Sequence, residues 1–480
     1  MITRRRFLAA MGLTGAGSIA FGLCGCSPFS RPTFKAAAPT TARFLTRPDL
    51  HPPLVSTSIG GPVGTGLIFI TAAGPLIVDN EGSMVWYQAL PSGTSVADFK
   101  VQQYKGQPVI TWWQGKILAG YGQGVHMLVN AQYQPLRTIQ AANGYQADLH
   151  DLQLTPEGTA LLTVYRQMPA DLSSVGGSTG GTVLEGIVQE IDLATGQVLL
   201  EWHSRDHVAL SESYATLPKA PNQPYDYFHI NSVAVGPDGN LLISARNTWS
   251  IYKIDRTSGG VLWRLGGKQS DFALGPGVPF SFQHDPRWHG RSTLTLFDDG
   301  AGPPNVESRS RGLRLELDEV SKTVTLSQQF VHSPEVLATS QGNVQVLDNG
   351  NVFVGWGSEP IFGEYTATGQ QVFNGQLAAD QSYRAFRFPW VGMPDEPPRA
   401  VARSSGVGTV DVFVSWSGAT EVTRWEVLAG SADSSLVPVA SGRRVGFETR
   451  ISVKTTASHV AVRALDQGGR VLGVSPTMAA

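Results

Sequence analysis

The stretch that decides the fold is Pro237-Asp238-Gly239-Asn240-Leu241-Leu242-Ile243-Ser244, a tight turn that leads into an apolar strand. The same pattern occurs twice more, at residues 156–162 and 348–354. A second pattern is a hairpin in which Gly follows a short polar loop, and it occurs at residues 79–86, 192–199, 255–263 and 365–372. Glycine permits the positive φ angle that such hairpins require. The chain is therefore predicted to consist of short strands joined by tight turns.

Strand-turn-strand units that recur along a chain are typical of β-propeller blades, because a four-stranded blade buries its faces only against its neighbours. We predict a six-bladed β-propeller over residues 53–393. The blades are expected near residues 57–92, 97–140, 147–203, 229–267, 282–331 and 343–390, with insertions at 166–185 and 204–228. A β-sandwich or a β-solenoid is the alternative arrangement of such repeats.

The composition favours an all-β protein. The 480 residues include 54 Gly, 30 Pro and 11 Trp, and no long segment has the apolar spacing of a helix. The formal net charge of -2 predicts no nucleic-acid partner, because no broad basic surface is expected. Both cysteines, Cys24 and Cys26, precede the expected folded part, so disulfides and thiol catalysis are excluded there.

The N-terminus has the features of an export signal. Three arginines, Arg4–Arg6, precede Phe7-Leu8 and a short apolar run, which together resemble a twin-arginine signal. Leu23-Cys24-Gly25-Cys26 resembles a bacterial lipobox. We expect residues 1–26 to be a signal peptide and a lipid on Cys26 to anchor the protein to the outer face of the cell membrane. An ordinary cleaved signal with a chance cysteine is the alternative, and twin-arginine and Sec export both stay open.

Two further segments flank the propeller. Residues 27–52 are rich in Pro, Ala, Thr and Arg, which suits a flexible tether. After the proline-rich boundary at 394–398 the repeat ends, and residues 398–480 resemble a fibronectin type III-like β-sandwich, with strands expected at 412–416, 423–428 and 459–464. Val460 stands where that family has a corner tyrosine, so an immunoglobulin-like relative stays open. Such a domain is expected to be a spacer or adhesion module.

Function is expected in the propeller, whose catalytic forms use side chains that converge on the central channel. Three of the ten histidines, His150, His229 and His284, begin or end the strand before a blade's turn, so we predict that they face one axis. Three histidines suit either a zinc or copper site or an anion pocket. Arg246 follows the strand after His229 and favours the anion, because a guanidinium group repels a metal cation and binds sulfate or phosphate. No metal site is therefore predicted.

The propeller sequence resembles the bacterial arylsulfate sulfotransferases, most specifically at residues 228–233, 242–247, 251–255 and 282–284. The resemblance implies a six-bladed propeller that moves a sulfuryl group from an aryl sulfate to a phenol without a nucleotide or other cofactor. Its partners would be small aromatic sulfates and phenols. It further implies that His284 is transiently sulfurylated, that His229, Asn231 and Arg246 bind sulfate, and that His150 is another histidine of the pocket.

The chemistry of imidazole agrees with that implication, because a neutral ring nitrogen can attack sulfur and then release the group to a phenol. Two carboxylates stand beside the histidines, Asp151 after His150 and Asp285 after His284. Adjacent residues on a strand face opposite ways, so both carboxylates are interpreted as solvated turn residues. Asp298 and Asp299 are likewise interpreted as a strand-ending turn and not as a calcium site.

Two other functions stay open. We expect no small N-terminal β-domain like that of the best-known enterobacterial members, and a C-terminal sandwich in its place. One is a quinoprotein-like dehydrogenase, suggested by the hairpins at 192–199 and 255–263. The other is a non-catalytic surface-binding propeller, which is preferred if His284 lies buried away from the channel. The physiological donor and acceptor and the oligomeric state are not predicted.

Overall fold

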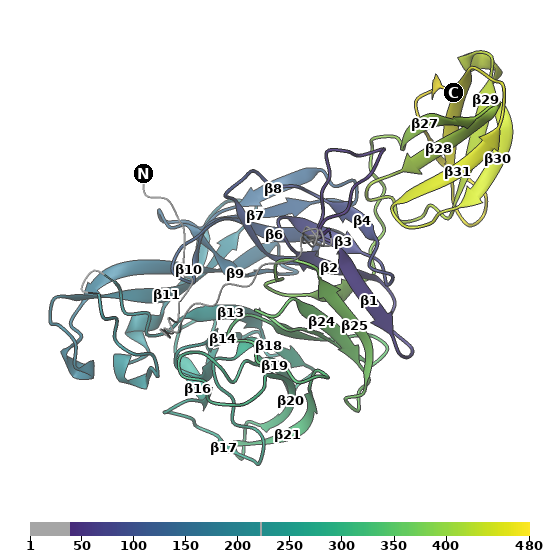
Figure 1. The fold of residues 1–480 in the computed structure, drawn as a ribbon. Coiled ribbons are helices and arrows are strands. Elements are labelled where there is room, and N and C mark those ends of the chain that lie inside the picture. The colour runs from purple at the N-terminus through teal and green to yellow at the C-terminus, as the bar shows by residue number, and fades with distance from the viewer. Residues whose placement is uncertain (1–38, 221–222) are drawn as a thin grey trace, which may run out of the picture. The chain divides into compact units, whose positions relative to one another are not determined.

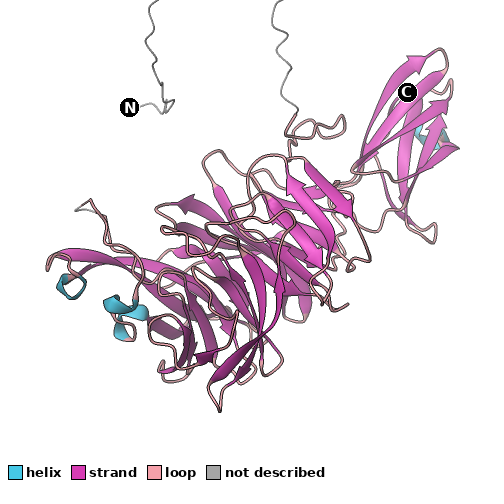
Figure 2. Ribbon diagram, turned by 60° about the horizontal axis from the view of Figure 1, so that its bottom comes forward, coloured by secondary structure: helices cyan, strands magenta, loops and turns pink. Residues whose placement is uncertain are grey.

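The computed structural model of the chain describes residues 39–220 and 223–480, which are strands and turns for the most part (Figure 1, Figure 2). The predicted signal peptide, Cys26 and the first part of the predicted tether lie outside the described residues. The helices of the described part are short 3-10 turns: η1 (Ser173–Val175), η2 (Ser204–Asp206), η3 (Leu210–Glu212) and η4 (Asp433–Ser435). None of them is long and apolar enough to cross a membrane.

Six four-stranded antiparallel units confirm the predicted six-bladed propeller (Figure 1). The first three are blade 1, with β26 (Phe386–Phe388), β2 (Leu67–Thr71), β3 (Pro75–Val78) and β4 (Met84–Tyr87); blade 2, with β5 (Ser95–Tyr104), β6 (Gln107–Ile117), β7 (Gly122–Val129) and β8 (Pro135–Ile139); and blade 3, with β9 (Ala147–Leu154), β10 (Thr159–Ala170), β11 (Gly181–Asp192) and β12 (Val198–His203). A pairing of Gly124 with Ala147 joins blades 2 and 3 into one sheet.

The other three units complete the ring. They are blade 4, with β13 (Ile230–Val235), β14 (Leu241–Ala245), β15 (Ser250–Ile254) and β16 (Val261–Gly266); blade 5, with β18 (His284–His289), β19 (Thr293–Asp298), β20 (Arg311–Asp318) and β21 (Thr323–Phe330); and blade 6, with β22 (Asn343–Val346), β23 (Val352–Gly355), β24 (Ile361–Tyr365) and β25 (Gln371–Leu377). A short strand, β17 (Ala273–Leu274), is added in parallel to β21. The first strand of each blade is the inner one, because these strands contact those of the neighbouring blades around the channel.

The ring closes by exchange of strands between its ends, which differs from the predicted first and last blades. β26, near the end of the propeller sequence, pairs with β2 near its start, so that Phe386 lies opposite Phe69. β1 (Val55–Ile59) pairs instead with β25, with Val55 opposite Leu377. A closed ring leaves fewer free strand edges for unwanted pairing. The turn and hairpin patterns did not predict this closure because it is a pairing between distant segments.

Apolar side chains between neighbouring blades form the core. Between blades 1 and 2, for example, Phe69, Trp86, Phe99 and Trp112 form one aromatic cluster, and the Phe69 and Phe99 ring centroids lie 5.2 Å apart. Aromatic rings bury a large area and gain further from tilted contacts of this kind. The inner strands are different, because they carry buried charged side chains, namely Asp98, Lys100, Asp151 and Asp285, and a further one, Arg384, stands two residues before β26. Buried charged side chains are thus concentrated on the inner strands and beside them.

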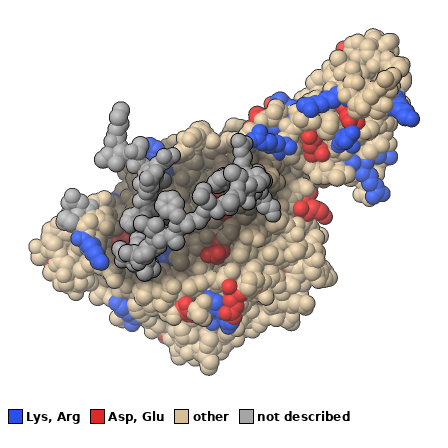
Figure 3. Space-filling model, viewed as in Figure 1, with Lys and Arg blue, Asp and Glu red and all other residues tan. Residues whose placement is uncertain are grey.

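Residues 399–479 form two sheets around a separate apolar core. One sheet contains β27 (Arg399–Gly406), β28 (Thr409–Ser415) and β31 (Glu448–Lys454); the other contains β29 (Arg424–Gly430), β30 (Val437–Arg443), β32 (His459–Leu465), β33 (Val471–Val474) and β34 (Met478–Ala479). Val412, Trp425 and Val462 meet between them. The domain is a β-sandwich, and its resemblance to fibronectin type III stays a prediction. On the face drawn in Figure 3 its surface carries basic and acidic side chains side by side.

Candidate functional site

One cavity of about 580 Å³ at the channel brings the three predicted histidines together. His150 lies within β9, His229 directly precedes β13, and His284 is the first residue of β18, so each comes from a different blade. The ring centroids of His150 and His229 are 5.0 Å apart. Arg246, directly after β14, lines the same cavity, as do Gln341 and Tyr383. The prediction that these histidines face one axis therefore agrees with their positions.

A carboxylate accepts a hydrogen bond from Nδ1 of each histidine. Nδ1 lies 2.7 Å from Asp299 Oδ2 in His284, 2.5 Å from Asp148 Oδ2 in His150 and 2.5 Å from Asp226 Oδ2 in His229. A carboxylate at Nδ1 fixes both the ring orientation and the tautomer. In each ring the other nitrogen, Nε2, is then the one that carries the lone pair.

The tautomer of His284 is fixed from both sides. The backbone N–H of Gln341 donates to its Nε2 at 3.2 Å, which requires a lone pair on that nitrogen. The ring proton is then on Nδ1, where Asp299 accepts it. His284 is only 1 % exposed, yet its ring lines the cavity. Its ring is thus neutral and oriented, with Nε2 as a hydrogen-bond acceptor, at the wall of a cavity.

The surroundings keep His284 uncharged. Burial, followed by the positive charge of Arg246, lowers the pKa of His284 well below its usual value. Burial also lowers the pKa of His229, against the opposing effect of Asp226. At neutral pH the ring of His284 is therefore uncharged.

Arg246 supplies the positive charge of the cavity. Its guanidinium group donates to Thr339 O at 2.9 Å and to Asn247 Oδ1 at 3.1 Å, and it lies over the Phe282 ring at 4.6 Å. Among the residues that the structure describes, no carboxylate is within ion-pair distance of it. A guanidinium group without a direct ion pair in a partly enclosed cavity is suited to binding an anion. In the same described ranges, no cluster of three or more His, Cys, Asp or Glu is arranged to hold a metal ion.

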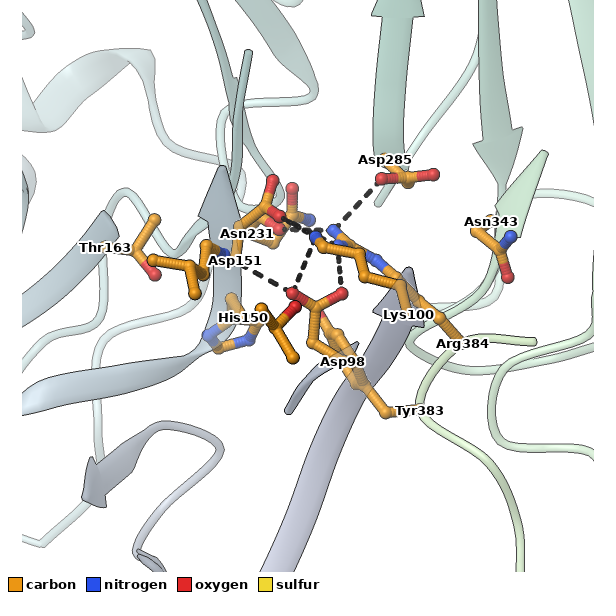
Figure 4. Close-up of polar contacts among 12 residues, drawn as sticks. Asp98, Lys100, His150, Asp151, Thr163, Asn231, Asp285, Asn343, Tyr383 and Arg384 are labelled. Atoms are coloured by element: carbon orange, nitrogen blue, oxygen red, sulfur yellow. Dashed lines mark hydrogen bonds and ion pairs between the residues drawn. The ribbon is translucent and has the colours of Figure 1, made fainter. Parts of the chain in front are cut away.

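Asn231 is the one proposed site residue that does not line the cavity. It is buried, its Nδ2 donates to Gln283 O at 2.7 Å, and its backbone oxygen accepts from Arg384. Its predicted contact with sulfate stays a prediction. The interpretation of Asp151 and Asp285 as solvated turn residues is wrong, because both are buried and paired with Arg384 (Figure 4).

Three residues of the candidate site were not predicted from the sequence, namely the hydrogen-bond partners of the histidines, Asp148, Asp226 and Asp299. The contact of Asp148 could have been predicted, because Asp148 stands two residues before His150 and alternate residues of a strand share a face. Asp226 lies in the loop before His229, where no periodicity applies. Asp299 follows β19 and meets His284 across the β18–β19 hairpin, so its interpretation as a simple turn residue overlooked that pairing.

Most of the propeller sequence matches a known protein family. The family model described as arylsulfotransferase (ASST) matches residues 100–378. A search of curated proteins finds no match. Similar solved structures include a protein of unknown function from Bacteroides caccae, with 13 % identity, a TM-score of 0.41, and coverage of 67 % of this chain and 98 % of the other.

Two other solved structures are similar at the same distant level. Regucalcin from Agrobacterium tumefaciens, a calcium-binding protein, is 14 % identical with a TM-score of 0.32, covering 72 % of this chain and 88 % of its own. An inactive variant of virginiamycin B lyase from Staphylococcus aureus is 12 % identical with a TM-score of 0.31, covering 78 % and 92 %. Likenesses this distant do not inform the function.

Proposed function

Because the chain belongs to the arylsulfotransferase family, we propose that it moves a sulfuryl group from an aryl sulfate donor to a phenolic acceptor through a sulfurylated His284, without a nucleotide cofactor. The observation that carries the proposal is the geometry of His284. Its Nε2 has a lone pair at the cavity wall, its Nδ1 is held by Asp299, and the free charge of Arg246 lines the same space.

The reaction divides into two displacements. In the first, the backbone N–H of Gln341 gives up its hydrogen bond to Nε2 of His284, the freed lone pair attacks sulfur, the bond from sulfur to the aryl oxygen breaks, and the phenolate leaves with the bonding electrons. The ring then carries positive charge, which Asp299 at Nδ1 stabilises, and this positive charge opposes the burial that raises the pKa of Asp299. In the second, the oxygen of an acceptor phenol attacks sulfur, the nitrogen–sulfur bond breaks, and Nε2 regains its lone pair. The phenol proton passes to a base, for which Nε2 of His229 or His150 is suited.

Arg246 would hold the sulfuryl oxygens during both steps, and His150 and His229 would add a donor to these oxygens when their Nε2 is protonated. A guanidinium group presents two donors in one plane, which matches two oxygens of a sulfuryl group. Donors that are fixed before the reaction stabilise the transition state without reorganisation.

Arg246→Lys is expected to lower kcat/KM for transfer by about 10- to 100-fold, because a single ammonium group does not reproduce the planar pair of donors. Steady-state assays with a chromogenic aryl sulfate and a second phenol measure this. Arg264→Lys is the matched control, because Arg264 is a partly buried arginine of β16 that pairs with Glu212 away from the cavity. Unchanged kcat/KM in Arg246→Lys would assign Arg246 a structural role through Thr339 and Asn247.

The pH dependence follows from the lowered pKa of His284. The reactive form is neutral, and a pKa below the usual value of about 6.5 keeps it neutral down to more acidic pH. We expect kcat/KM to stay level as the pH falls to about 6.5 and to decrease only at lower pH, where His284 becomes protonated. An acidic limb centred above about 6.5 in the profile of the wild-type protein would contradict this environment for His284.

A direct assay separates this function from its alternatives. Purified protein is incubated with an aryl sulfate and a second phenol in the absence of any nucleotide, and the sulfated acceptor is quantified. Transfer supports the proposal. If no acceptor is sulfated with any of a panel of phenols, the proposal is wrong, and the protein is a non-catalytic binding propeller or, if it reduces an artificial electron acceptor with an alcohol, a quinoprotein-like dehydrogenase.

A further inference from the structure

A single buried arginine makes polar contacts with the inner strands of several blades. Arg384 is 0 % exposed and stands two residues before β26. Its guanidinium group is 2.8 Å from Asp98, 3.1 Å from Asp151 and 3.2 Å from Asp285, and it donates to the backbone oxygen of Asn231 at 3.1 Å. Figure 4 shows these groups gathered around its side chain. One side chain of blade 1 is therefore bonded to the inner strands of blades 2, 3, 4 and 5.

Three of these contacts lie next to a histidine of the cavity. Asp151 follows His150, Asp285 follows His284, and Asn231 is two residues after His229. The histidines line the cavity, whereas Asp151, Asp285 and Arg384 do not. In each of these two pairs of adjacent residues, the histidine thus lines the cavity and the aspartate contacts Arg384.

Two further basic groups complete the cluster. Lys100 Nζ is 2.7 Å from Asp98 and 2.9 Å from Asp151, and Arg287 is 2.6 Å from both Asp151 and Asp285. Three carboxylates thus meet three basic groups. Buried charges are tolerated when they are paired in this way, and such clusters hold their members in one arrangement better than an apolar contact does.

We propose that Arg384 is a positioning residue for the transfer reaction, which fixes the inner strands of His150, His229 and His284 so that the three rings face one substrate. The inference rests on the proposed function for its reaction, but the placement of the rings is testable without it. A guanidinium plane holds several partners at set angles, and an ammonium group does not. A displacement of about 1 Å among reacting groups is enough to lower a rate about 100-fold.

Arg384→Lys is the first test, with Arg387→Lys as its control. Arg387 lies in β26, is as deeply buried, and pairs with Glu364 at 2.9 Å, but it contacts no strand that carries a cavity histidine. We expect Arg384→Lys to lower kcat about 10- to 100-fold with KM changed less than threefold, and Arg387→Lys to keep kcat within about threefold. Wild-type kcat in a folded Arg384→Lys protein, or an equal loss in both variants, would overturn the proposal.

A second pair of variants covers the case in which Arg384→Lys does not fold. Asp285→Asn removes one charge that Arg384 holds beside His284, and Glu364→Gln removes the matching charge beside Arg387. Asp285→Asn is expected to lower kcat about tenfold or more and Glu364→Gln less than threefold. The reverse order, or equal effects, would contradict a positioning role.

A measurement without turnover separates this inference from the proposed function. In protein with 15N-labelled histidine, we expect Arg384→Lys to shift the ring signals of His150 and His284, assigned through single His→Gln variants, and Arg387→Lys to leave them in place. Shifts in a protein that transfers no sulfuryl group would overturn the function and keep the positioning role. Unmoved signals in Arg384→Lys would overturn the positioning role whatever the activity.

Discussion

Replacing His284 with Ala is expected to reduce sulfuryl transfer by about 10³-fold or more, because no neighbouring side chain can replace a covalent nucleophile held at the cavity wall. The ring of His284 is fixed by hydrogen bonds at both nitrogens. Nδ1 donates to Asp299, and Nε2 accepts from the backbone N–H of Gln341. The rate is measured with a chromogenic aryl sulfate and a second phenol. Thermal unfolding, followed in parallel, establishes that the variant is folded.

The control for this variant is His332→Ala. His332 is also buried and also bonded through both ring nitrogens, to Pro334 O and Asn374 Oδ1, but it does not line the cavity. It should lose stability without losing a comparable share of the rate. A folded His284→Ala protein that retains a tenth or more of the wild-type rate would remove His284 from the covalent role.

The second large effect is expected for Asp299→Asn, which should lower kcat by about 10² to 10⁴-fold. An amide at this position no longer stabilises the positive ring of sulfurylated His284, and its NH₂ group can donate to Nδ1 and favour the wrong tautomer. The comparable change in the Ser-His-Asp triad costs about 10⁴-fold. Single-turnover rates with the aryl sulfate alone measure the first step directly.

Asp298→Asn is the matched control, because the two carboxylates are adjacent and both are buried. Asp298 bonds to Arg311 and to the backbone of Ser281, not to a histidine. Its variant should keep kcat within about threefold. If Asp298→Asn and Asp299→Asn lose activity equally, the effect belongs to the β19 turn as a whole and not to the tautomer of His284.

The fold was predictable as far as it depends on local patterns. The turn at 237–240 precedes β14, and the hairpin at 255–260 joins β15 to β16, where each pattern places them. Ring closure was not predictable in this way. β26 pairs with β2 across most of the chain, and β1 joins β25, although each segment alone has the pattern of any short strand.

Site residues at equivalent positions of successive blades could be predicted from the sequence, and the other site residues could not. His150, His229 and His284 occupy related places in successive blades, and Arg246 follows the strand after one of them. Their carboxylate partners come from a strand, a loop and a hairpin end, so no single spacing relates them. The role of Arg384 was still harder to predict, because it is an isolated arginine near the end of the propeller sequence. Only the closed ring places it beside Asp151 and Asp285.

The most direct test of the central proposal is to look for the covalent intermediate. The protein is incubated with an aryl sulfate and no acceptor, and its intact mass and peptide masses are then measured, with His284→Ala treated in the same way. We predict the mass of one sulfuryl group on the peptide that contains His284, its loss when a phenol is added, and its absence from His284→Ala. Transfer that proceeds in the wild-type protein with no adduct on His284 under any of these conditions would contradict the account, and His284 would then be a residue that binds sulfate for direct transfer.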